Sequence, residues 1–208
     1  MNYVLSGVVP NNISDLSELT HMDLLSNLLS GDIPESIGNL NNLIYLDLQV
    51  NLLSGDIPES IGNLDNITWL YLNTNLLSGD IPESIGNLPN IEYLNFRLNQ
   101  LTGEIPNTIY NLLSLKGLFL SENYLDGEID YSINNLINLD YLYLRNNQLS
   151  GEIPESICDL TLDFNSDLFQ IQNNQLCPPY PSCIEDYVGD QDTSECIECN
   201  DVIGDTND

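Results

Sequence analysis

The chain has 208 residues, of which 32 are acidic and only 3 are Lys or Arg, so its formal net charge at pH 7 is −29. This balance argues against nucleic-acid binding, which needs basic side chains to displace counterions from phosphates, and against attraction to an anionic membrane surface. No apolar run reaches the roughly 18 residues of a spanning helix, so no membrane insertion is expected. A hydrophobic content of 42% also excludes a disordered acidic polymer.

The chain is built from repeats of 24 residues. A fixed period of this length is typical of stacked supersecondary units rather than of a closed globule. We predict one solenoid with repeats over 1–160, a last repeat and cysteine cap over 161–188, and an acidic tail over 189–208. The residues that mark the frame are Asn27, Asn51, Asn75, Asn99, Asn123 and Asn147, followed by Asn174 after a slip of three residues.

The first residues lack both the basic region and the apolar stretch of a signal peptide. In the frame of the repeat, Tyr3 takes the position of the asparagine, so the chain is expected to begin halfway through a repeat without a cap. Solenoids need polar caps on their open ends, so this start favours a fragment of a longer protein or an end that another molecule covers. A degenerate first repeat that serves as its own cap is the alternative.

Each repeat is expected to open with a short strand. Leu46 and Leu48 alternate with polar or aromatic residues, which is the period-two pattern of a strand with one buried face. The asparagine that follows, Asn51 in this repeat, is buried by its frame, and a buried amide must be paired. We expect it to bond backbone groups of the neighbouring turns, each rung contributing on the order of 1 kcal/mol.

The second half of each repeat turns the chain back. Gly55 suits an unusual backbone angle, and Pro58 removes a backbone donor and blocks a regular helix interior. The pattern over 59–64 then predicts a short helical turn, with Ile61 and Leu64 pointing inward.

This pattern resembles the plant-type leucine-rich repeat, which carries the segment Leu-Ser-Gly-x-Ile-Pro in each unit. The resemblance covers roughly residues 4–176, and six copies agree at eight or more positions each. Receptor-kinase ectodomains and polygalacturonase-inhibiting proteins carry this repeat. The resemblance implies a β-rich α/β solenoid, a right-handed superhelix with a parallel sheet on its concave side. It also implies a second short strand at the Leu-Ser-Gly segment and short helical turns on the convex side.

The variable strand positions are expected to face outward on the concave side. Aromatic residues gather there with two of the three basic residues, and such side chains are the usual anchors of recognition surfaces. The alternative is that aromatics simply suit exposed strands and pair across them. We favour a binding face for a protein or glycan ligand, made of Tyr45, Asp47, Trp69, Tyr71, Tyr93, Arg97, Phe119, Tyr141, Tyr143 and Arg145.

Acidic residues form two further columns, in which like charges on neighbouring turns about 4.8 Å apart repel by roughly 0.9 kcal/mol in water. One interpretation is a solvated surface suited to a saline or extracellular setting. The other is Ca²⁺ held weakly between adjacent carboxylates, although a flat column offers fewer oxygens than a calcium site needs. The first column is Asp32, Asp56, Asp80, Glu104, Glu128 and Glu152, and the second includes Glu35, Glu59, Glu83 and Glu155.

The five cysteines, Cys158, Cys177, Cys183, Cys196 and Cys199, lie in the last repeat and beyond it. The run over 177–183 resembles the cysteine cap that closes plant-type leucine-rich repeats. With that resemblance we pair Cys177 with Cys183, and Cys158 then meets Cys196 or Cys199, leaving one thiol over. Disulfides in a cap indicate an oxidising compartment, and hence a secreted or cell-surface protein. Zinc or redox chemistry at the final Cys-x-x-Cys is the weaker alternative, because no second ligand pair is visible.

The final residues resemble the opening of a calcium loop of a dockerin-like module that is cut short. Asp205 and Asn207 are therefore weak calcium candidates, and no other cofactor or metal is expected.

No enzyme is expected, because no nucleophile–base set can be built around the single histidine, His21. The leading hypothesis is a secreted or cell-surface recognition module. The second is a structural or adhesive element that self-associates through its uncapped N-terminal end, with divalent cations bridging the acids. The third is ice binding, which needs a flat and uncharged face and is therefore disfavoured by the acidic columns and bulky aromatics.

Overall fold

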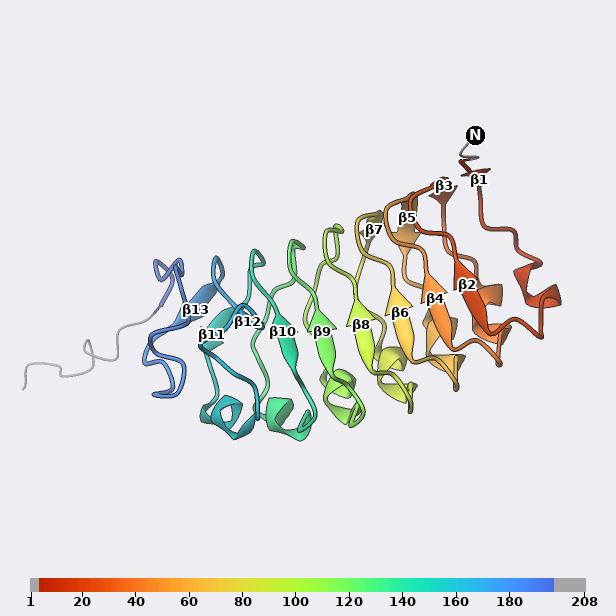
Figure 1. Ribbon diagram of the computed structural model, residues 1–208. Helices are drawn as coiled ribbons and strands as arrows, with labels where there is room; N and C mark the ends of the chain where they lie inside the picture. The colour runs from red at the N-terminus through yellow and green to blue at the C-terminus, as the bar shows by residue number, and fades with distance from the viewer. Residues whose placement is uncertain (1–3, 197–208) are drawn as a thin grey trace, which may run out of the picture.

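The computed structural model describes residues 4–196, which form one solenoid with a regular succession of turns (Figure 1). Each regular turn contributes one strand to a long sheet, then passes through the Leu-Ser-Gly segment and a short helix. No helix within the described residues is long and apolar enough to cross a membrane. The α/β solenoid with a parallel sheet is thereby confirmed.

The long sheet has seven strands, and every neighbouring pair is parallel. The register follows the repeat, since Leu46 lies beside Leu70 and Leu70 beside Leu94. In chain order the strands are β2 (His21–Asp23), β4 (Tyr45–Asp47), β6 (Trp69–Tyr71), β8 (Tyr93–Asn95), β9 (Gly117–Phe119), β10 (Tyr141–Tyr143) and β12 (Phe169–Gln170).

The second short strand is also present, so this expectation is confirmed. It builds a four-stranded parallel sheet at the N-terminal end and a two-stranded one at the C-terminal end. The first contains β1 (Ser6–Gly7), β3 (Leu28–Gly31), β5 (Leu52–Asp56) and β7 (Leu76–Ser78), and the second contains β11 (Ser150–Glu152) and β13 (Gln175–Cys177).

The helical turns are 3-10 helices, most of them opened by proline. Pro58 is extended at φ −66°, and its carbonyl accepts from Ile61 N at 3.0 Å to begin the turn. Gly62 lets consecutive turns pack closely, because a Cβ there would collide with Ser84. The helices are η1 (Ile13–Asp15), η2 (Glu35–Asn39), η3 (Glu59–Asn63), η4 (Glu83–Asn87), η5 (Asn107–Asn111), η6 (Tyr131–Asn135) and η7 (Glu155–Asp159).

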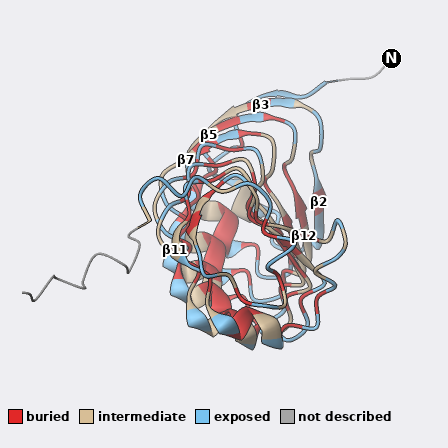
Figure 2. Cartoon of the chain, turned by 90° about the vertical axis from the view of Figure 1, so that its left-hand side faces the viewer, coloured by how far each residue is buried: buried red, intermediate tan, exposed pale blue. Residues whose placement is uncertain are grey.

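The core is a continuous column of leucine and isoleucine inside the turns. Figure 2, which looks along the solenoid, shows the buried residues on the inner sides of the strands and helices. Leu46, Leu48, Ile61 and Leu64 have no exposed surface, as the sequence pattern predicts. Each turn covers its neighbour's apolar face, so the hydrophobic stabilisation belongs to the stack and not to a single repeat.

The asparagine ladder is confirmed. Asn51 Nδ2 donates to the carbonyls of Leu24 and Leu48, both at 3.0 Å, and its Oδ1 accepts from Leu29 N at 3.0 Å. One side chain thus binds backbone groups of its own turn and of the preceding one. The same pattern repeats at Asn75, Asn99, Asn123, Asn147 and Asn174.

A second ladder, which we did not predict, runs where the helices lead into the strands. The Nδ2 groups of Asn42, Asn66, Asn90 and Asn138 each donate to a carbonyl 25 residues earlier, at 2.7–2.9 Å. All four residues are exposed and asparagine is frequent throughout the chain, so the sequence alone does not distinguish these rungs from other surface asparagines.

The residue before each rung of the first ladder has a left-handed backbone, with φ between 55° and 62°. Gly and Asn tolerate this region, whereas a β-branched side chain does not. The chain nevertheless places Val50 and Thr74 there, and Asn146 and Asn173 farther along. The frame of the repeat therefore imposes the conformation on whatever residue occupies the position.

The C-terminal cap corrects our cysteine pairing. Cys158 bonds Cys183, and Cys177 bonds Cys196, with Cα–Cα distances of 5.8 and 5.6 Å. The predicted Cys177–Cys183 pair is therefore wrong. Cys183 lies 25 residues after Cys158, the same offset that joins neighbouring turns in the second ladder, whereas Cys177 ends strand β13. Cys199, Asp205 and Asn207 lie outside the described residues.

Gln191 continues the ladder beyond its last asparagine. Its Nε2 donates to the carbonyls of Ile171 and Val188, and its Oε1 accepts from Leu176 N. Asp192 N also donates to the Asn174 carbonyl at 2.8 Å. The segment around Gln191 thus supplies hydrogen-bond partners for backbone groups of the last turn of the solenoid.

We predict that Asn99→Ala lowers the free energy of unfolding by about 3 kcal/mol. The change removes three hydrogen bonds, to Leu72 O, Phe96 O and Leu77 N, and leaves buried backbone groups unpaired. Urea denaturation measures the loss. Asn87→Ala, at an exposed helix end, is the control with little expected effect. Similar losses for the two variants would contradict the ladder's role.

We predict that Val50→Asn raises the free energy of unfolding by about 1 kcal/mol, because Asn tolerates the left-handed backbone that valine strains. The Val50 side chain is 42% exposed, so its loss leaves no core cavity. Denaturant unfolding of both proteins provides the measurement. Ile137→Asn also removes an exposed apolar side chain, but outside a left-handed position, and should change little.

Candidate functional site

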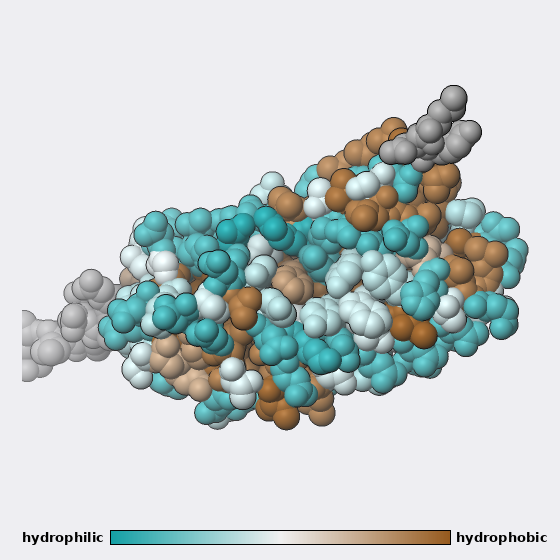
Figure 3. All heavy atoms as spheres, in the orientation of Figure 1, coloured by the Kyte–Doolittle hydropathy of each residue, from teal (hydrophilic) through white to brown (hydrophobic). Residues whose placement is uncertain are grey.

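The predicted site residues come together on the outer face of the seven-stranded sheet. The strands supply eight of them, and Arg97 and Arg145 lie two residues beyond the ends of β8 and β10. In Figure 3, which has the orientation of Figure 1, side chains of intermediate hydropathy gather over β4, β6 and β8 on this face. All ten except Asp47 are half-buried.

A first aromatic cluster covers the N-terminal half of this face. The Tyr45 ring lies 6.1 Å from His21, 6.2 Å from Trp69 and 5.9 Å from Tyr71 between ring centroids. The Tyr45–Tyr71 contact is edge-on, an arrangement that stabilises the pair beyond its area of burial. The cluster therefore offers a preformed apolar surface with polar edges.

Asp47 lies beneath this cluster, so its predicted exposure as a ligand-binding residue is wrong. It is only 1% exposed, and its oxygens accept from Tyr45 Oη at 2.9 Å, Gln49 Nε2 at 2.8 Å and Gln49 N at 3.0 Å. Gln49 Oε1 in turn accepts from Asn73 Nδ2 at 3.1 Å. The carboxylate is satisfied internally, so its role is to position Tyr45 and Gln49.

Burial and the carboxylate of Asp47 both act on Tyr45. Burial is the larger cause that raises the pKa of the Tyr45 hydroxyl, followed by the hydrogen bond to Asp47 and its negative charge. The pKa of Tyr71 is likewise raised, mainly by burial. The Tyr45 hydroxyl, which donates to Asp47, therefore keeps its proton to higher pH than an ordinary tyrosine.

A second aromatic cluster covers the C-terminal half. Phe119 lies 5.8 Å from Tyr141 and 5.0 Å from Tyr143, and the contact with Tyr143 is edge-on. Gly117 lies between the two clusters, and a Cβ there would come within 2.5 Å of the Phe119 ring and 2.9 Å of Tyr93. The glycine therefore lets these two rings lie low over the sheet.

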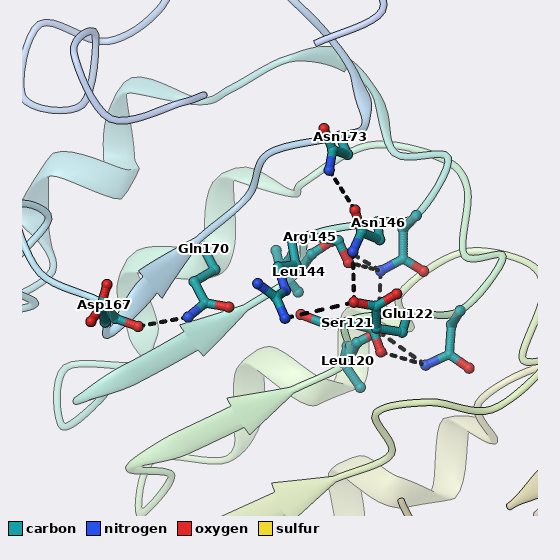
Figure 4. A network of polar contacts seen from close by, with 11 residues as sticks. Leu120, Ser121, Glu122, Leu144, Arg145, Asn146, Asp167, Gln170 and Asn173 are labelled. Atoms are coloured by element: carbon teal, nitrogen blue, oxygen red, sulfur yellow. Dashed lines mark hydrogen bonds and ion pairs between the residues drawn. The ribbon is translucent and has the colours of Figure 1, made fainter. Parts of the chain in front are cut away.

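Arg145 belongs to a polar network at the edge of this face (Figure 4). Its Nη2 lies 3.6 Å from Glu122 Oε1, which also accepts from Asn146 Nδ2 at 2.6 Å. Asn173 Nδ2 donates to Asn146 Oδ1 at 2.6 Å, which extends the network to the cap. We did not predict Glu122 as a site residue. In the sequence, Glu122 differs from the other residues that precede a ladder asparagine only because it is charged.

The acidic columns, from Asp32 to Glu104, line a separate groove of about 1080 Å³, with isoleucine and proline side chains among its walls. Each aspartate lies over the glycine of the next turn, because a Cβ at Gly79 would come within 2.4 Å of Asp56 Oδ1. Within residues 4–196, no group of three acidic, His or Cys side chains is close enough to hold a metal ion. The groove therefore gives a polyanionic flank beside the aromatic face.

The chain matches a known repeat family and is similar to several solved structures. The Leucine Rich Repeat family model matches residues 18–40, 42–64, 66–88, 90–112 and 138–160. No curated protein matches in sequence. The ectodomain of the Arabidopsis receptor kinase HAESA, in complex with an N-terminally extended IDA peptide hormone, is 34% identical over 91% of this chain and 32% of that chain, with a TM-score of 0.81.

Two further solved structures are similar. The plant peptide hormone receptor RGFR1, in complex with RGF2, is 34% identical over 83% of this chain and 27% of that chain, with a TM-score of 0.78. A plant ice-binding protein is 27% identical over 86% of this chain and 72% of that chain, with a TM-score of 0.61. The chain thus spans about a third or less of the length of the two receptors.

We predict that alkaline pH destabilises the protein partly through Tyr45. The folded-state pKa of Tyr45 is raised, so its contribution is fully present below the ordinary tyrosine value of about 10 and is lost as pH rises towards the folded-state pKa. Unfolding free energy should fall more steeply above pH ~10 in the wild type than in Tyr45→Phe. Equal slopes in urea denaturation series would contradict this.

Proposed function

Because the chain belongs to the leucine-rich repeat family, we propose that it is a ligand-recognition module that binds a peptide or protein segment on the outer face of its seven-stranded sheet. The observation that carries the proposal is the pair of aromatic clusters around Tyr45 and Phe119 on this face. Half-buried aromatic side chains lose little conformational freedom when a ligand covers them, so they are efficient anchors.

The order already present on this face supports the proposal. Asp47, Gln49 and Asn73 are joined by hydrogen bonds across two turns, and they hold the floor beneath Tyr45. Contacts between rings fix the side chains above this floor. A preorganised surface spends less of its binding free energy on ordering its own side chains.

The similar receptors support a peptide ligand, since HAESA and RGFR1 were each solved with a peptide hormone bound. The chain spans only part of their length, so we propose ligand recognition for it and do not propose receptor signalling. The disulfides Cys158–Cys183 and Cys177–Cys196 support an extracellular location. We assign no catalytic role, since repeated carboxylates give no single tuned acid–base site.

Ice binding is the second candidate, because the similar plant ice-binding protein is covered over 72% of its length. A surface that matches ice needs a flat, regular and uncharged column of side chains. The regular column from Asp32 to Glu152 is charged, and the sheet face carries half-buried rings of several shapes. We therefore place peptide recognition first, and a thermal-hysteresis measurement separates the two candidates.

We predict that Trp69→Ala and Tyr141→Ala weaken the binding of peptides selected from a randomised phage-displayed library by about tenfold or more. Each change removes an aromatic anchor from one of the clusters while the core stays intact. Affinity by surface plasmon resonance and folding by thermal unfolding are measured together.

The matched controls are Tyr124→Ala and Tyr131→Ala, which remove tyrosines that are 54% and 67% exposed and lie outside the sheet. These variants should bind as the wild type does. Selected peptides that tolerate both sheet-face variants but lose affinity for a control would contradict the proposed face. A library of glycans, tested in parallel, would identify a sugar ligand instead.

A further inference from the structure

A second concave surface, which we call the cap hollow, lies at the C-terminal end of the seven-stranded sheet. It has a volume of about 910 Å³, within the range of roughly 300–1,000 Å³ that small-ligand sites span. Its lining comes from Arg145, from residues in and after β12, from the segment 164–167 and from the cap segment 186–190. The rings of the two aromatic clusters do not line it, so the cap hollow is distinct from them.

The segment 164–167 is ordered by its own contacts. The period of the repeat slips by three residues in this part of the chain, which makes the connection between η7 and β12 longer than in the other turns. Ser166 Oγ donates to the Asp163 carbonyl at 2.6 Å, and the Phe164 ring packs edge-on against Phe169 with centroids 5.0 Å apart. This part of the lining therefore has a defined shape before any ligand binds.

The cap segment is held against the last turn in a similar way. Asn173 N donates to the Asp190 carbonyl at 2.6 Å. Gly189 has a left-handed backbone with φ 64°, and a Cβ there would come within 2.5 Å of Gln172 Cβ. Both parts of the lining are thus fixed by the fold, which lowers the cost of ordering them around a ligand.

The lining both donates and accepts hydrogen bonds. Carboxylates only accept and a guanidinium only donates, whereas an amide side chain does both. Gln170 contributes such an amide, and its Nε2 donates to the Asp167 carbonyl at 2.9 Å while its Oε1 stays able to accept (Figure 4). Within residues 4–196 none of the carboxylates of the hollow forms an ion pair. These carboxylates belong to Asp167, Asp186 and Asp190, and further amides come from Asn165 and Gln172.

The mixture of charges disfavours an ionic ligand. A cation would be repelled by Arg145, and an anion would be repelled by three aspartates within a chain of net charge −29. A neutral molecule with many hydroxyl groups meets neither repulsion, and each of its hydroxyls both donates and accepts. Sugars are the common biological molecules of this kind.

Aromatic side chains supply the apolar surface that a sugar ring also needs. Tyr187 lines the cap hollow, and 38% of its surface is exposed. Phe164 is half-buried and adds a second ring to the lining. The face of an aromatic ring is partly negative, so it attracts the C–H groups on the apolar side of a sugar ring.

We propose that the cap hollow binds a neutral oligosaccharide. The ring of Tyr187 packs against one sugar unit, while the carboxylates and amides of the lining exchange hydrogen bonds with the hydroxyl groups. This site goes beyond the proposed peptide recognition, because it uses different side chains and a ligand of a different chemical class.

The test uses a panel of neutral hexasaccharides of glucose, mannose, xylose and N-acetylglucosamine. At least one should bind the full chain with a Kd below about 1 mM in isothermal titration calorimetry. In the same titration, followed by NMR, the side-chain amide resonances of Gln170 and Gln172 should shift saturably. The fluorescence of Trp69, which lies on β6 outside the hollow, should not change. Failure of every hexasaccharide to bind in this range would overturn the proposal.

Substitutions at Tyr187 test the position of the sugar. Tyr187→Ala should weaken binding of the identified hexasaccharide by about tenfold or more, whereas Tyr187→Phe keeps the ring and should stay within about threefold of the wild type. The matched control is Tyr131→Ala, which removes a tyrosine that is 67% exposed on η6, outside the hollow, and should bind as the wild type does. Thermal unfolding of each variant verifies that the fold is intact.

A carboxylate of the hollow provides a second, independent variant. Asp190→Asn should weaken binding several-fold, because a carboxylate accepts stronger hydrogen bonds from hydroxyls than a neutral amide does. Asp65→Asn, at an exposed position outside the hollow, makes the same change of charge and should have no effect.

Three results would overturn the proposal even if a sugar binds. The first is wild-type affinity in Tyr187→Ala. The second is a loss of sugar binding in Trp69→Ala, which would place the sugar on the sheet face. The third is tighter binding of hexagalacturonate or hexalysine than of any neutral hexasaccharide when that binding depends on Tyr187, which would assign an ionic ligand to the hollow.

Discussion

The asparagine ladder is the interaction on which the rest of the structure depends. Each turn of a solenoid leaves backbone donors and acceptors where the chain leaves the sheet, and these groups are buried between turns. Asn51 pairs with three of them, on its own turn and the preceding one. Leaving a buried backbone group unpaired costs more free energy than one hydrogen bond contributes. The repeat therefore tolerates little variation at this residue.

This fixed frame leaves the residues between the rungs free to vary. The ladder sets the left-handed residue before each rung, the register of the strands and the offset between neighbouring turns. With those constraints met, the outward strand positions need only be compatible with a sheet. The aromatic clusters occupy these positions, so the proposed recognition and the stability of the stack depend on different side chains of the same repeat.

Charge shapes the molecule on a larger scale. The acidic columns lie along a flank, where each aspartate covers the glycine of the next turn, as Asp56 covers Gly79. A glycine is required at position 79 for two reasons. Its backbone is left-handed, and a Cβ would collide with the Asp56 carboxylate. The flank therefore repels other anions.

The sequence alone determined the period, the parallel strands, the short helical turns and the rungs from Asn27 to Asn174. These follow from local pattern, because identical turns in a stack must place identical residues in equivalent surroundings. It also identified the outward residues, since alternation in a strand assigns them to one face.

Only the tertiary structure decided which side chains meet across turns. Asp47 is covered by its neighbours, although its position in the strand predicts exposure. Cys158 bonds Cys183 because their turns are adjacent, and no local pattern encodes that contact. Glu122 pairs with Arg145 and none of the described carboxylates pairs with Arg97, a difference that depends on side-chain reach. The repeat can be predicted from the sequence because it needs only local order. The site, in contrast, depends on contacts between neighbouring turns, such as Tyr45 with Trp69 and Phe119 with Tyr141, which no local pattern encodes.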